Sequence, residues 1–285
     1  MRKHTIAKKL MLILWDFFPI HQLEIGRISR AWPTKPLKAL ERIAISRADV
    51  VALMTPANER FFRSYHPDLR SETIVIPPWS SSGSDEATER PAKFERFTVV
   101  FGGQLAKGRG VDTLLAAAAL LQNTGEDIDI TIAGDGTERM MLESEAERLH
   151  LKRVEFTGAL PRTDYRALLQ RAHVGLAITV AGVTPPSFPS KIVEYCGLGL
   201  PVVVCVEASS DAGTIVENSH AGISVPVGDA AGVANAIRTL YADFHDGIYT
   251  HWERRARRFY ETKLSTNKAV ERIEQYVKGN AISVA

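Results

Sequence analysis

Continuous apolar runs alternate with amphipathic segments from residue 97 onward. The apolar runs predict buried strands, which span residues 97–101, 128–133, 154–156, 174–178, 202–206 and 222–225. The segments between them predict helices at 111–121, 137–149, 162–171, 190–197, 213–218 and 229–244. Strands without polar alternation are typical of a parallel sheet that helices cover on both faces. We therefore expect a doubly wound α/β domain over residues 97–250.

The first 78 residues show a weaker α/β pattern. They predict strands at 10–15, 50–54 and 73–78 and helices at 37–48 and 56–64. Three strands and two helices are at the low end of what builds a stable core alone. A polar, serine-rich stretch follows and is typical of a linker. The expected domains are a partial N-terminal α/β domain over 1–78, a linker over 79–96, the domain over 97–250 and terminal helices over 251–285.

Two of the predicted helices have a threonine near their start, where a hydroxyl often accepts a hydrogen bond from the first turn. We expect Thr137 and Thr163 to cap the helices at 137–149 and 162–171. Three strands also run into glycine, at Gly102, Gly134 and Gly158. Because ligands of open parallel sheets bind at the carboxyl edge, these glycines mark the expected binding edge.

Composition excludes several classes of protein. The formal net charge of the 285 residues is +2, so the global basic field of a nucleic-acid binder is absent. The two cysteines, Cys196 and Cys205, form no disulfide or metal pattern, which favours a cytoplasmic location. The apolar stretch at 10–15 follows a basic run at 2–9, but it is too short to span a membrane and no small-residue cleavage site follows. We interpret it as the first strand, not as a signal peptide.

The segment 252–260 near the C-terminus is strongly basic. A basic helix can contact anionic lipid headgroups, which would make the protein peripheral on the inner face of the membrane. A plain solvated face is the alternative, because charge runs on terminal helices are common.

The helix at 190–197 carries the strongest signal for chemistry. It opens from a loop rich in proline and serine at 184–189, at the carboxyl end of a predicted strand. The start of a helix presents free N–H groups and a positive dipole to an anion. Lys191 and Glu194 are three residues apart and share one helix face, and a carboxylate there suits sugar hydroxyls. The alternative for this pair is an ordinary surface ion pair.

The turn at 102–110 contains four glycines and two cations, Lys107 and Arg109. Glycine lets the backbone approach a phosphate, and either cation could neutralise it. The spacing is not that of a P-loop, and an ordinary strand-to-helix turn remains the alternative.

The segment 134–139 approaches the dinucleotide-binding fingerprint, with Glu155 about 20 residues later. Arg139 stands in place of the third glycine, which weakens the match. An NAD-dependent oxidoreductase is therefore a minor alternative.

Two further positions lie next to predicted strand ends. The backbone of Ala159 and Leu160 could meet the edge of a base, although an ordinary turn explains these residues equally well. Asp16 follows the first strand and is a candidate base or acceptor contact. His21, five residues later, is interpreted as an ordinary loop histidine.

Taken together, these landmarks resemble the family 4 (group 1) retaining glycosyltransferases of the GT-B fold. The segments that carry the likeness are 102–108, 112–116, 132–136, 154–158, 189–195 and 199–203. The resemblance covers residues 97–245 well. It implies a GT-B-like fold in which a Rossmann-type C-terminal domain binds the donor. The chain departs from the family by seeming to begin inside the N-terminal acceptor domain.

The resemblance implies a role for each candidate residue. Glu194 would hold the ribose, and Lys107 with Arg109 would hold the diphosphate. The remaining donor-binding positions are Gly102, Gly103, Gly134, Ala159, Leu160, Ser190 and Lys191. Asp16, Lys107 and Glu194 form the catalytic set. The family's first sugar-contacting carboxylate falls at Pro186 and is missing.

The resulting expectation is a glycosyltransferase that moves a sugar from a UDP- or GDP-sugar to an acceptor hydroxyl, in polysaccharide or glycolipid synthesis. The acceptor would be a sugar or a lipid-linked sugar, and no metal or other cofactor is expected. The second hypothesis is a non-catalytic or split-enzyme subunit that binds a nucleotide sugar.

Overall fold

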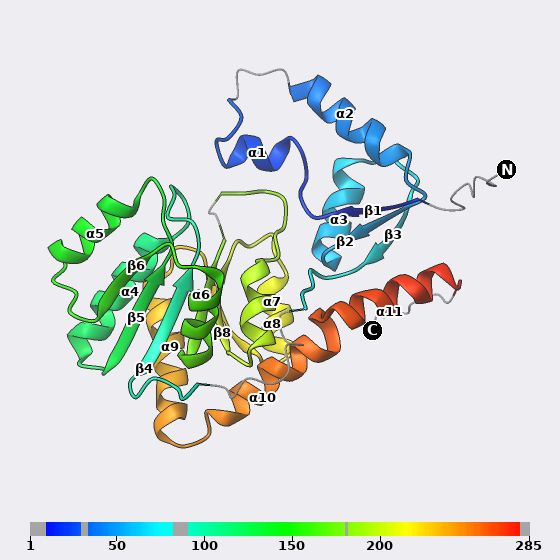
Figure 1. Cartoon of the computed structure of the whole chain (residues 1–285). Helices are drawn as coiled ribbons and strands as arrows, with labels where there is room; N and C mark the ends of the chain where they lie inside the picture. Colours follow the sequence, from blue (N-terminus) through cyan, green and yellow to red (C-terminus); the bar gives the residue numbers. More distant parts are fainter. Residues whose placement is uncertain (1–9, 30–33, 82–90, 180–181, 280–285) are drawn as a thin grey trace. The chain divides into compact units, whose positions relative to one another are not determined.

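A computed structural model describes residues 10–29, 34–81, 91–179 and 182–279 (Figure 1). The basic run at 2–9 and residues 82–90 of the expected linker lie outside the described residues. The chain divides into two compact units. The first comprises Met1–Pro78 with two short later segments, Gly182–Phe188 and Ser209–Asp211, and the second comprises the rest.

The first unit is built on a parallel sheet of three strands in the order β1-β2-β3. The strands are β1 (Met11–Leu14), β2 (Val50–Leu53) and β3 (Glu72–Val75), and the helices are α1 (Ile20–Glu24), α2 (Thr34–Ser46) and α3 (Pro56–Tyr65). Phe17, Ile45 and Phe62 are fully buried in its core with strand β2. Helix α1 was not predicted, because five residues are too few to show a helical period.

The second unit contains six parallel strands in the order β6-β5-β4-β7-β8-β9 (Figure 1). The strands are β4 (Phe97–Gly102), β5 (Ile128–Ala133), β6 (Val154–Gly158), β7 (Val174–Ile178), β8 (Val202–Val206) and β9 (Gly222–Pro226). Strand β4 pairs with both β5 and β7, so the order reverses between β4 and β7. This reversal is the topological switch point of a doubly wound sheet.

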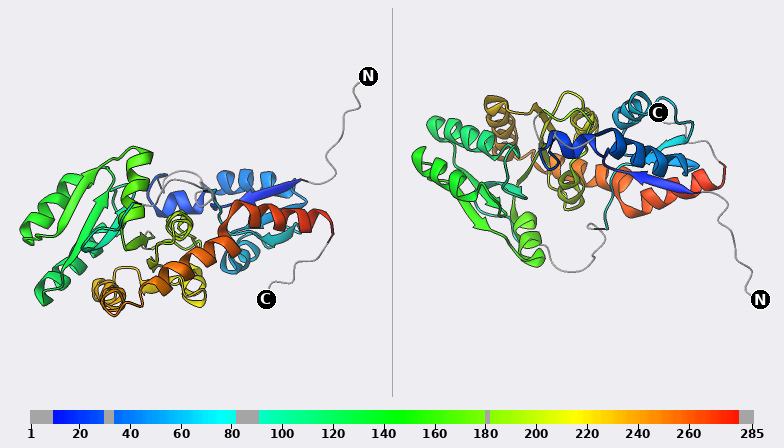
Figure 2. Two further views of the ribbon diagram at one scale, coloured as in Figure 1. Left: turned by 60° about the horizontal axis from the view of Figure 1, so that its bottom comes forward. Right: turned by 90° about the horizontal axis from the view of Figure 1, so that it is seen from above.

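Helices connect these strands and extend the chain beyond them (Figure 2). They are α4 (Val111–Thr124), α5 (Arg139–Arg148), α6 (Arg162–Arg171), α7 (Ser190–Gly197), α8 (Ala212–Asn218), α9 (Ala230–His245), α10 (Thr250–Phe259) and α11 (Thr266–Val277). A π-helical turn, Tyr260–Leu264, separates α10 from α11. The strands and helices predicted from 97 onward are all present, with small changes at their ends.

Both predicted threonine caps are wrong. Helix α5 begins at Arg139, and Glu138 occupies the capping position without a side-chain bond. Helix α6 begins directly after Pro161, which places Thr163 inside the first turn. There its hydroxyl donates to Asp164 Oδ1 instead of capping the helix.

Helices cover both faces of the six-stranded sheet. Val174 and Leu176 of β7 belong to the core that also contains α4, α5 and α9. Gly175 lies between them and points to the opposite face, because side chains alternate along a strand. A Cβ at Gly175 would overlap the ring of Tyr195 in α7. Helix α7 therefore packs on the face opposite α4 and α9, which confirms the doubly wound α/β prediction.

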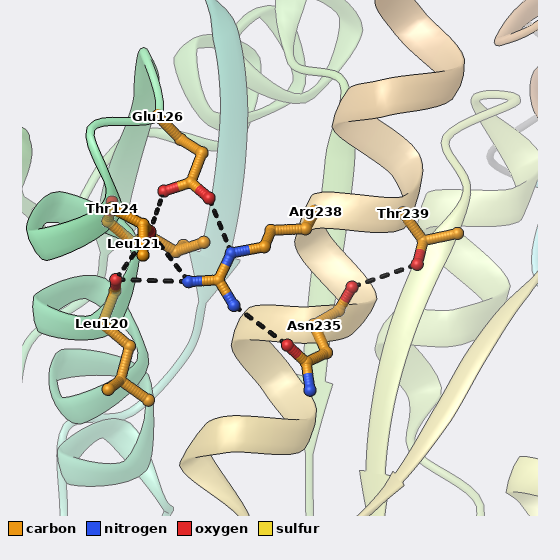
Figure 3. Close-up of polar contacts among 7 residues, drawn as sticks. All are labelled: Leu120, Leu121, Thr124, Glu126, Asn235, Arg238 and Thr239. Atoms are coloured by element: carbon orange, nitrogen blue, oxygen red, sulfur yellow. Dashed lines mark hydrogen bonds and ion pairs between the residues drawn. The ribbon is translucent and has the colours of Figure 1, made fainter.

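A polar cluster joins α9 to the last turn of α4 (Figure 3). Arg238 Nε donates to Glu126 Oε1 at 2.6 Å, and its guanidinium also donates to Leu120 O at 3.2 Å. Burial favours a higher pKa of Glu126, but hydrogen bonds from Thr124 and Arg238 together lower the pKa below its ordinary value. The cluster fixes α9 beside α4 and stabilises this face of the unit.

His173 is buried just before β7 among aromatic rings. Its Nδ1 accepts a hydrogen bond from the amide of Thr98 at 3.0 Å, and its ring stacks on Phe97 at 5.1 Å. Burial and then the charge of Lys93 lower the pKa of His173 to about 4. The folded protein therefore holds this histidine neutral at neutral pH.

We expect His173 to make the protein less stable in mild acid. In the unfolded chain this histidine is protonated near pH 6.5, whereas in the folded chain it is protonated only near pH 4. Its contribution to the free energy of unfolding is therefore complete above pH 6.5 and is lost as the pH falls toward 4. Thermal unfolding between pH 7.5 and 5 should show a steep fall in Tm for the wild type. His173→Asn should flatten that fall even though it lowers the Tm at pH 7.5, whereas the exposed-site control His251→Gln should not. An unchanged slope in His173→Asn contradicts the assignment.

Candidate functional site

A pocket of about 510 Å³ lies at the carboxyl edge of the six-stranded sheet. It occupies the position where β4, β5 and β6 end beside the start of α7, at the switch point of the sheet. The residues that line it are Gly102, Gly103, Gln104, Ala133, Gly134, Asp135, Ala159, Leu160, Tyr165, Ser190, Lys191 and Glu194. All of them belong to the second unit.

The floor of the pocket is made by glycine turns that touch through their backbones. The amide of Gly103 donates to Ala133 O at 2.9 Å, and the amide of Gly134 donates to Gly158 O at 2.8 Å. Gly134 has φ +150°, and a Cβ at this position would overlap the carbonyl oxygen of Gly103. Only glycine fits, because both the space and the backbone angle exclude a side chain.

Helix α7 brings its amino end to the pocket. Pro189 precedes its first residue, and no side chain caps the helix. Ser190 and Lys191, the first two residues, line the pocket. The uncapped N–H groups and the positive end of the helix dipole therefore lie at the pocket wall, where they suit an anion.

Lys191 and Glu194 carry shifted pKa values. Burial lowers the pKa of Lys191, and the charge of Arg109 lowers it further, while Glu194 acts in the opposite direction. Burial raises the pKa of Glu194 against the attraction of Lys191, Arg162 and Arg166. Within the described part of the chain, neither Lys191 nor Glu194 makes an ion pair or side-chain hydrogen bond. The ordinary surface ion pair considered from the sequence is therefore not what the structure contains.

The structure brings together most of the residues that the sequence nominated. Those that line the pocket are Gly102, Gly103, Gly134, Ala159, Leu160, Ser190, Lys191 and Glu194. Arg109 does not line it, yet it is close enough to lower the pKa of Lys191. Lys107 is exposed on the same loop and is not among the lining residues.

Asp16 belongs to the first unit, in the turn after β1. Its Oδ1 lies 3.3 Å from Nδ1 of His21, so the histidine interpreted as an ordinary loop residue has an acidic neighbour. A hollow of about 760 Å³ also occurs in this unit, and Asp49 and Ser71, at the amino ends of β2 and β3, line it. That is the edge of a parallel sheet opposite to the one where ligands bind.

Four lining residues were not singled out from the sequence: Gln104, Ala133, Asp135 and Tyr165. Tyr165 is the most informative of them because it comes from α6, a helix to which no site residue was assigned. An aromatic residue on an amphipathic helix normally indicates core packing, so the sequence held no signal for its place in the pocket.

Neither a metal cluster nor a membrane-spanning helix occurs in the described part of the chain. Over these residues, no group of three or more His, Cys, Asp and Glu side chains is arranged to hold a metal ion. In the same ranges, every helix is too short or too polar to cross a bilayer.

The strand order and the pocket at its reversal define a doubly wound α/β protein with a ligand pocket at the switch point. The family model described as "Glycosyl transferases group 1" matches residues 96–243, and the chain belongs to this family. The family expectation from the sequence is thus confirmed.

Curated relatives agree with this membership. The chain is 27% identical over 230 residues to a glycogen synthase of Mycobacterium tuberculosis, covering 79% of this chain and 54% of the relative. It is 29% identical over 136 residues to a component of the human phosphatidylinositol N-acetylglucosaminyltransferase, covering 47% of this chain and 27% of the relative. The chain therefore spans about half or less of the curated relatives it matches.

Solved structures share the fold. Anabaena HepE in complex with UDP and glucose superposes with a TM-score of 0.71 at 20% identity, covering 95% of this chain and 71% of that one. The pneumococcal O-GlcNAc transferase GtfA in complex with UDP and GlcNAc gives a TM-score of 0.68 at 15% identity, covering 96% and 53%. The GT-B-like fold expected from the sequence is confirmed.

We expect Gly134→Ala to lose much more stability than a glycine substitution with open space. A Cβ at Gly134 meets the backbone of Gly103, whereas Gly125, at φ +81°, has nothing within 4 Å of an added Cβ. Gly125→Ala should therefore cost only the left-handed strain of about 1–2 kcal/mol, and Gly134→Ala should cost clearly more. Urea unfolding of both variants measures the difference. Equal losses would show that the two turns do not need direct backbone contact.

Proposed function

We propose that this chain contains the donor-binding unit of a glycosyltransferase that moves a sugar from a nucleoside diphosphate sugar to an acceptor hydroxyl. The observation that carries the proposal is the pocket in which the amino end of α7, Lys191 and Glu194 meet the turn at Gly103. Membership of the glycosyltransferase family and the UDP complex of the similar HepE structure support it.

The charges of the pocket suit the two ends of such a donor. The diphosphate would lie against the N–H groups of α7, Lys191 and Arg109, with Lys107 reaching in from its exposed position. Glu194 would accept hydrogen bonds from ribose hydroxyls. The backbone at Ala159 and Leu160 would meet the base, since both residues line the pocket wall beyond β6.

Transfer breaks the bond between the anomeric carbon and the diphosphate oxygen, and the acceptor oxygen forms the new bond. The negative charge that develops on the departing diphosphate would be stabilised by the helix N-terminus and the cations, which are in place before the reaction. Asp16 is the candidate to accept the proton of the acceptor hydroxyl. We propose a retaining outcome, as in the retaining family that the sequence resembles.

Calorimetric titration of the whole chain with UDP, UDP-glucose, GDP, GDP-mannose and NAD tests the proposal. We expect binding of a nucleoside diphosphate or its sugar and none of NAD. A transfer assay with the same donors then separates an active enzyme from the second hypothesis, a split-enzyme or non-catalytic binding protein. Binding of NAD alone would favour the oxidoreductase alternative.

Glu194→Gln should weaken binding of the preferred nucleotide sugar by more than tenfold and leave the Tm nearly unchanged. The substitution removes a half-buried carboxylate that makes no ion pair or side-chain hydrogen bond within the described residues, so the fold loses little while the ribose loses a charged acceptor. Because the pKa of Glu194 is raised, its carboxylate is protonated at a higher pH than an ordinary glutamate. As the pH is lowered, nucleotide binding should therefore begin to weaken at a correspondingly higher pH. Glu155→Gln is the matched control, since Glu155 is exposed on β6 and would contact only a dinucleotide. Equal affinity in wild type and Glu194→Gln removes Glu194 from the site.

We also propose that the protein is cytoplasmic and contacts an anionic membrane surface to reach a lipid-linked acceptor. Arg254, Arg255 and Arg258 are exposed on α10, and within the described residues no ion pair engages them. Ile248, just before the helix, is 46% exposed and adds an apolar contact. Exposed arginines on a helix that follows an exposed apolar residue suit anionic headgroups.

Vesicle co-sedimentation tests this surface. The chain should sediment with phosphatidylglycerol-containing vesicles and not with phosphatidylcholine vesicles, and salt should reverse the binding. Changing Arg254, Arg255 and Arg258 together to Gln should weaken binding more than tenfold, at about 1 kcal/mol for each charge near the surface. A variant with Arg148, Lys268 and Lys278 changed to Gln has the same net charge and serves as the control. Equal losses in both variants would indicate a general charge effect and no specific surface.

A further inference from the structure

Tyr165 lines the pocket, and α6 contributes no other lining residue. It lies one turn into α6 and is half-buried. Beneath it lies Tyr195 of α7, which is fully buried. The two hydroxyl oxygens are 3.5 Å apart, a distance at which one can donate to the other.

The buried tyrosine has three polar neighbours. Tyr195 Oη accepts from the amide of Gly102 at 3.3 Å and lies 3.5 Å from the carbonyl oxygen of Leu176, which can only accept. Either tyrosine can be the donor in the bond between the two hydroxyls. Because a phenol both donates and accepts, the hydroxyl of Tyr165 keeps hydrogen-bonding capacity for a further partner.

The hydroxyl of Tyr165 has few protein partners. Within the described ranges Tyr195 is the one group recorded in a hydrogen bond with it, while Tyr165 and Glu194 line the same pocket. Burial raises the pKa of Tyr165 to about 12; the hydrogen bond with Tyr195 opposes this rise and the charge of Glu194 adds to it. The group therefore stays a neutral phenol at neutral pH.

The close fit of Tyr165 depends on the residue opposite it. Gly102 ends β4, and a Cβ at this position would overlap the hydroxyl of Tyr165. The absence of a side chain at Gly102 therefore lets the phenol rest against the end of the strand.

We propose that Tyr165 is a second ribose-recognising residue, whose hydroxyl hydrogen-bonds to one ribose hydroxyl while Glu194 accepts from its neighbour. The inference rests on the proposed function, because it assigns a further contact within the same nucleotide pocket. A phenol and a carboxylate that line one pocket can serve the two adjacent hydroxyls of a ribose. They make the site select ribonucleotides over deoxyribonucleotides, because a missing hydroxyl leaves one of these two groups without its partner.

Calorimetry with UDP and GDP and with their 2′-deoxy and 3′-deoxy analogues tests the inference. Tyr165→Phe should bind the preferred nucleotide three- to tenfold more weakly than the wild type, roughly the range expected for one hydrogen bond to a neutral group. For one of the two deoxy analogues, the wild type and Tyr165→Phe should have equal affinity, because the hydroxyl that Tyr165 recognises is already absent. Tyr241→Phe, on α9, is the matched control and should behave as the wild type.

Two results overturn the inference while the proposed function stands. One is an unchanged affinity of Tyr165→Phe for the intact nucleotide. The other is an equal loss for the intact nucleotide and both deoxy analogues, which would show that the ring only shapes the pocket. If the wild type binds no nucleoside diphosphate, the proposed function fails and this inference fails with it. Tm values of Tyr165→Phe and wild type within a few degrees exclude misfolding as the cause.

Discussion

Backbone contact among the glycine turns after β4, β5 and β6 is the constraint on which the rest of the site depends. The amide of Gly103 bonds to Ala133 O, and the amide of Gly134 bonds to Gly158 O, so neighbouring strands stay joined beyond their last ladder pairs. A side chain at Gly134 would push these turns apart. Because these turns stay in backbone contact with one another, α7 can bring its uncapped amino end to the same edge of the sheet. A pocket then forms at the switch point.

The charged groups of this pocket are arranged for a ligand more than for the fold. Burial disfavours the charged forms of both Lys191 and Glu194. Nearby charges partly offset this cost, but among the described residues neither side chain makes a direct ion pair or side-chain hydrogen bond. Partly buried charges that no hydrogen bond satisfies cost stability. A nucleoside diphosphate would relieve that cost at two points, since it carries anionic oxygens for the lysine and the helix end and hydroxyls for the glutamate.

The loop that leads into α7 belongs to a different compact unit from the helix that follows it, which local sequence patterns do not reveal. Residues 182–188 and 209–211 cluster with the first unit although they lie in the sequence of the second. Asn58 Nδ2 donates to Pro186 O at 2.7 Å, and the amide of Ala57 donates to Asp211 Oδ2 at 2.8 Å. These bonds join residues 128 and 154 positions apart, so no window of sequence contains both partners. The carbonyl of Pro186, in the loop before α7, is thus held by the side chain of Asn58.

The sequence by itself determined the strands, the helices and the glycine turns, because apolar periodicity and glycine report on local burial and backbone angle. It also nominated most of the pocket, since the carboxyl ends of parallel strands meet at one edge whatever their order. Only the tertiary structure decided that Tyr165 joins that pocket, that Lys107 does not line it, and that Lys191 and Glu194 form no direct ion pair among the described residues. Those facts depend on how α6, α7 and the turn after β4 pack against one another. Packing between segments that are distant in sequence produces no hydrophobic periodicity from which it could be predicted.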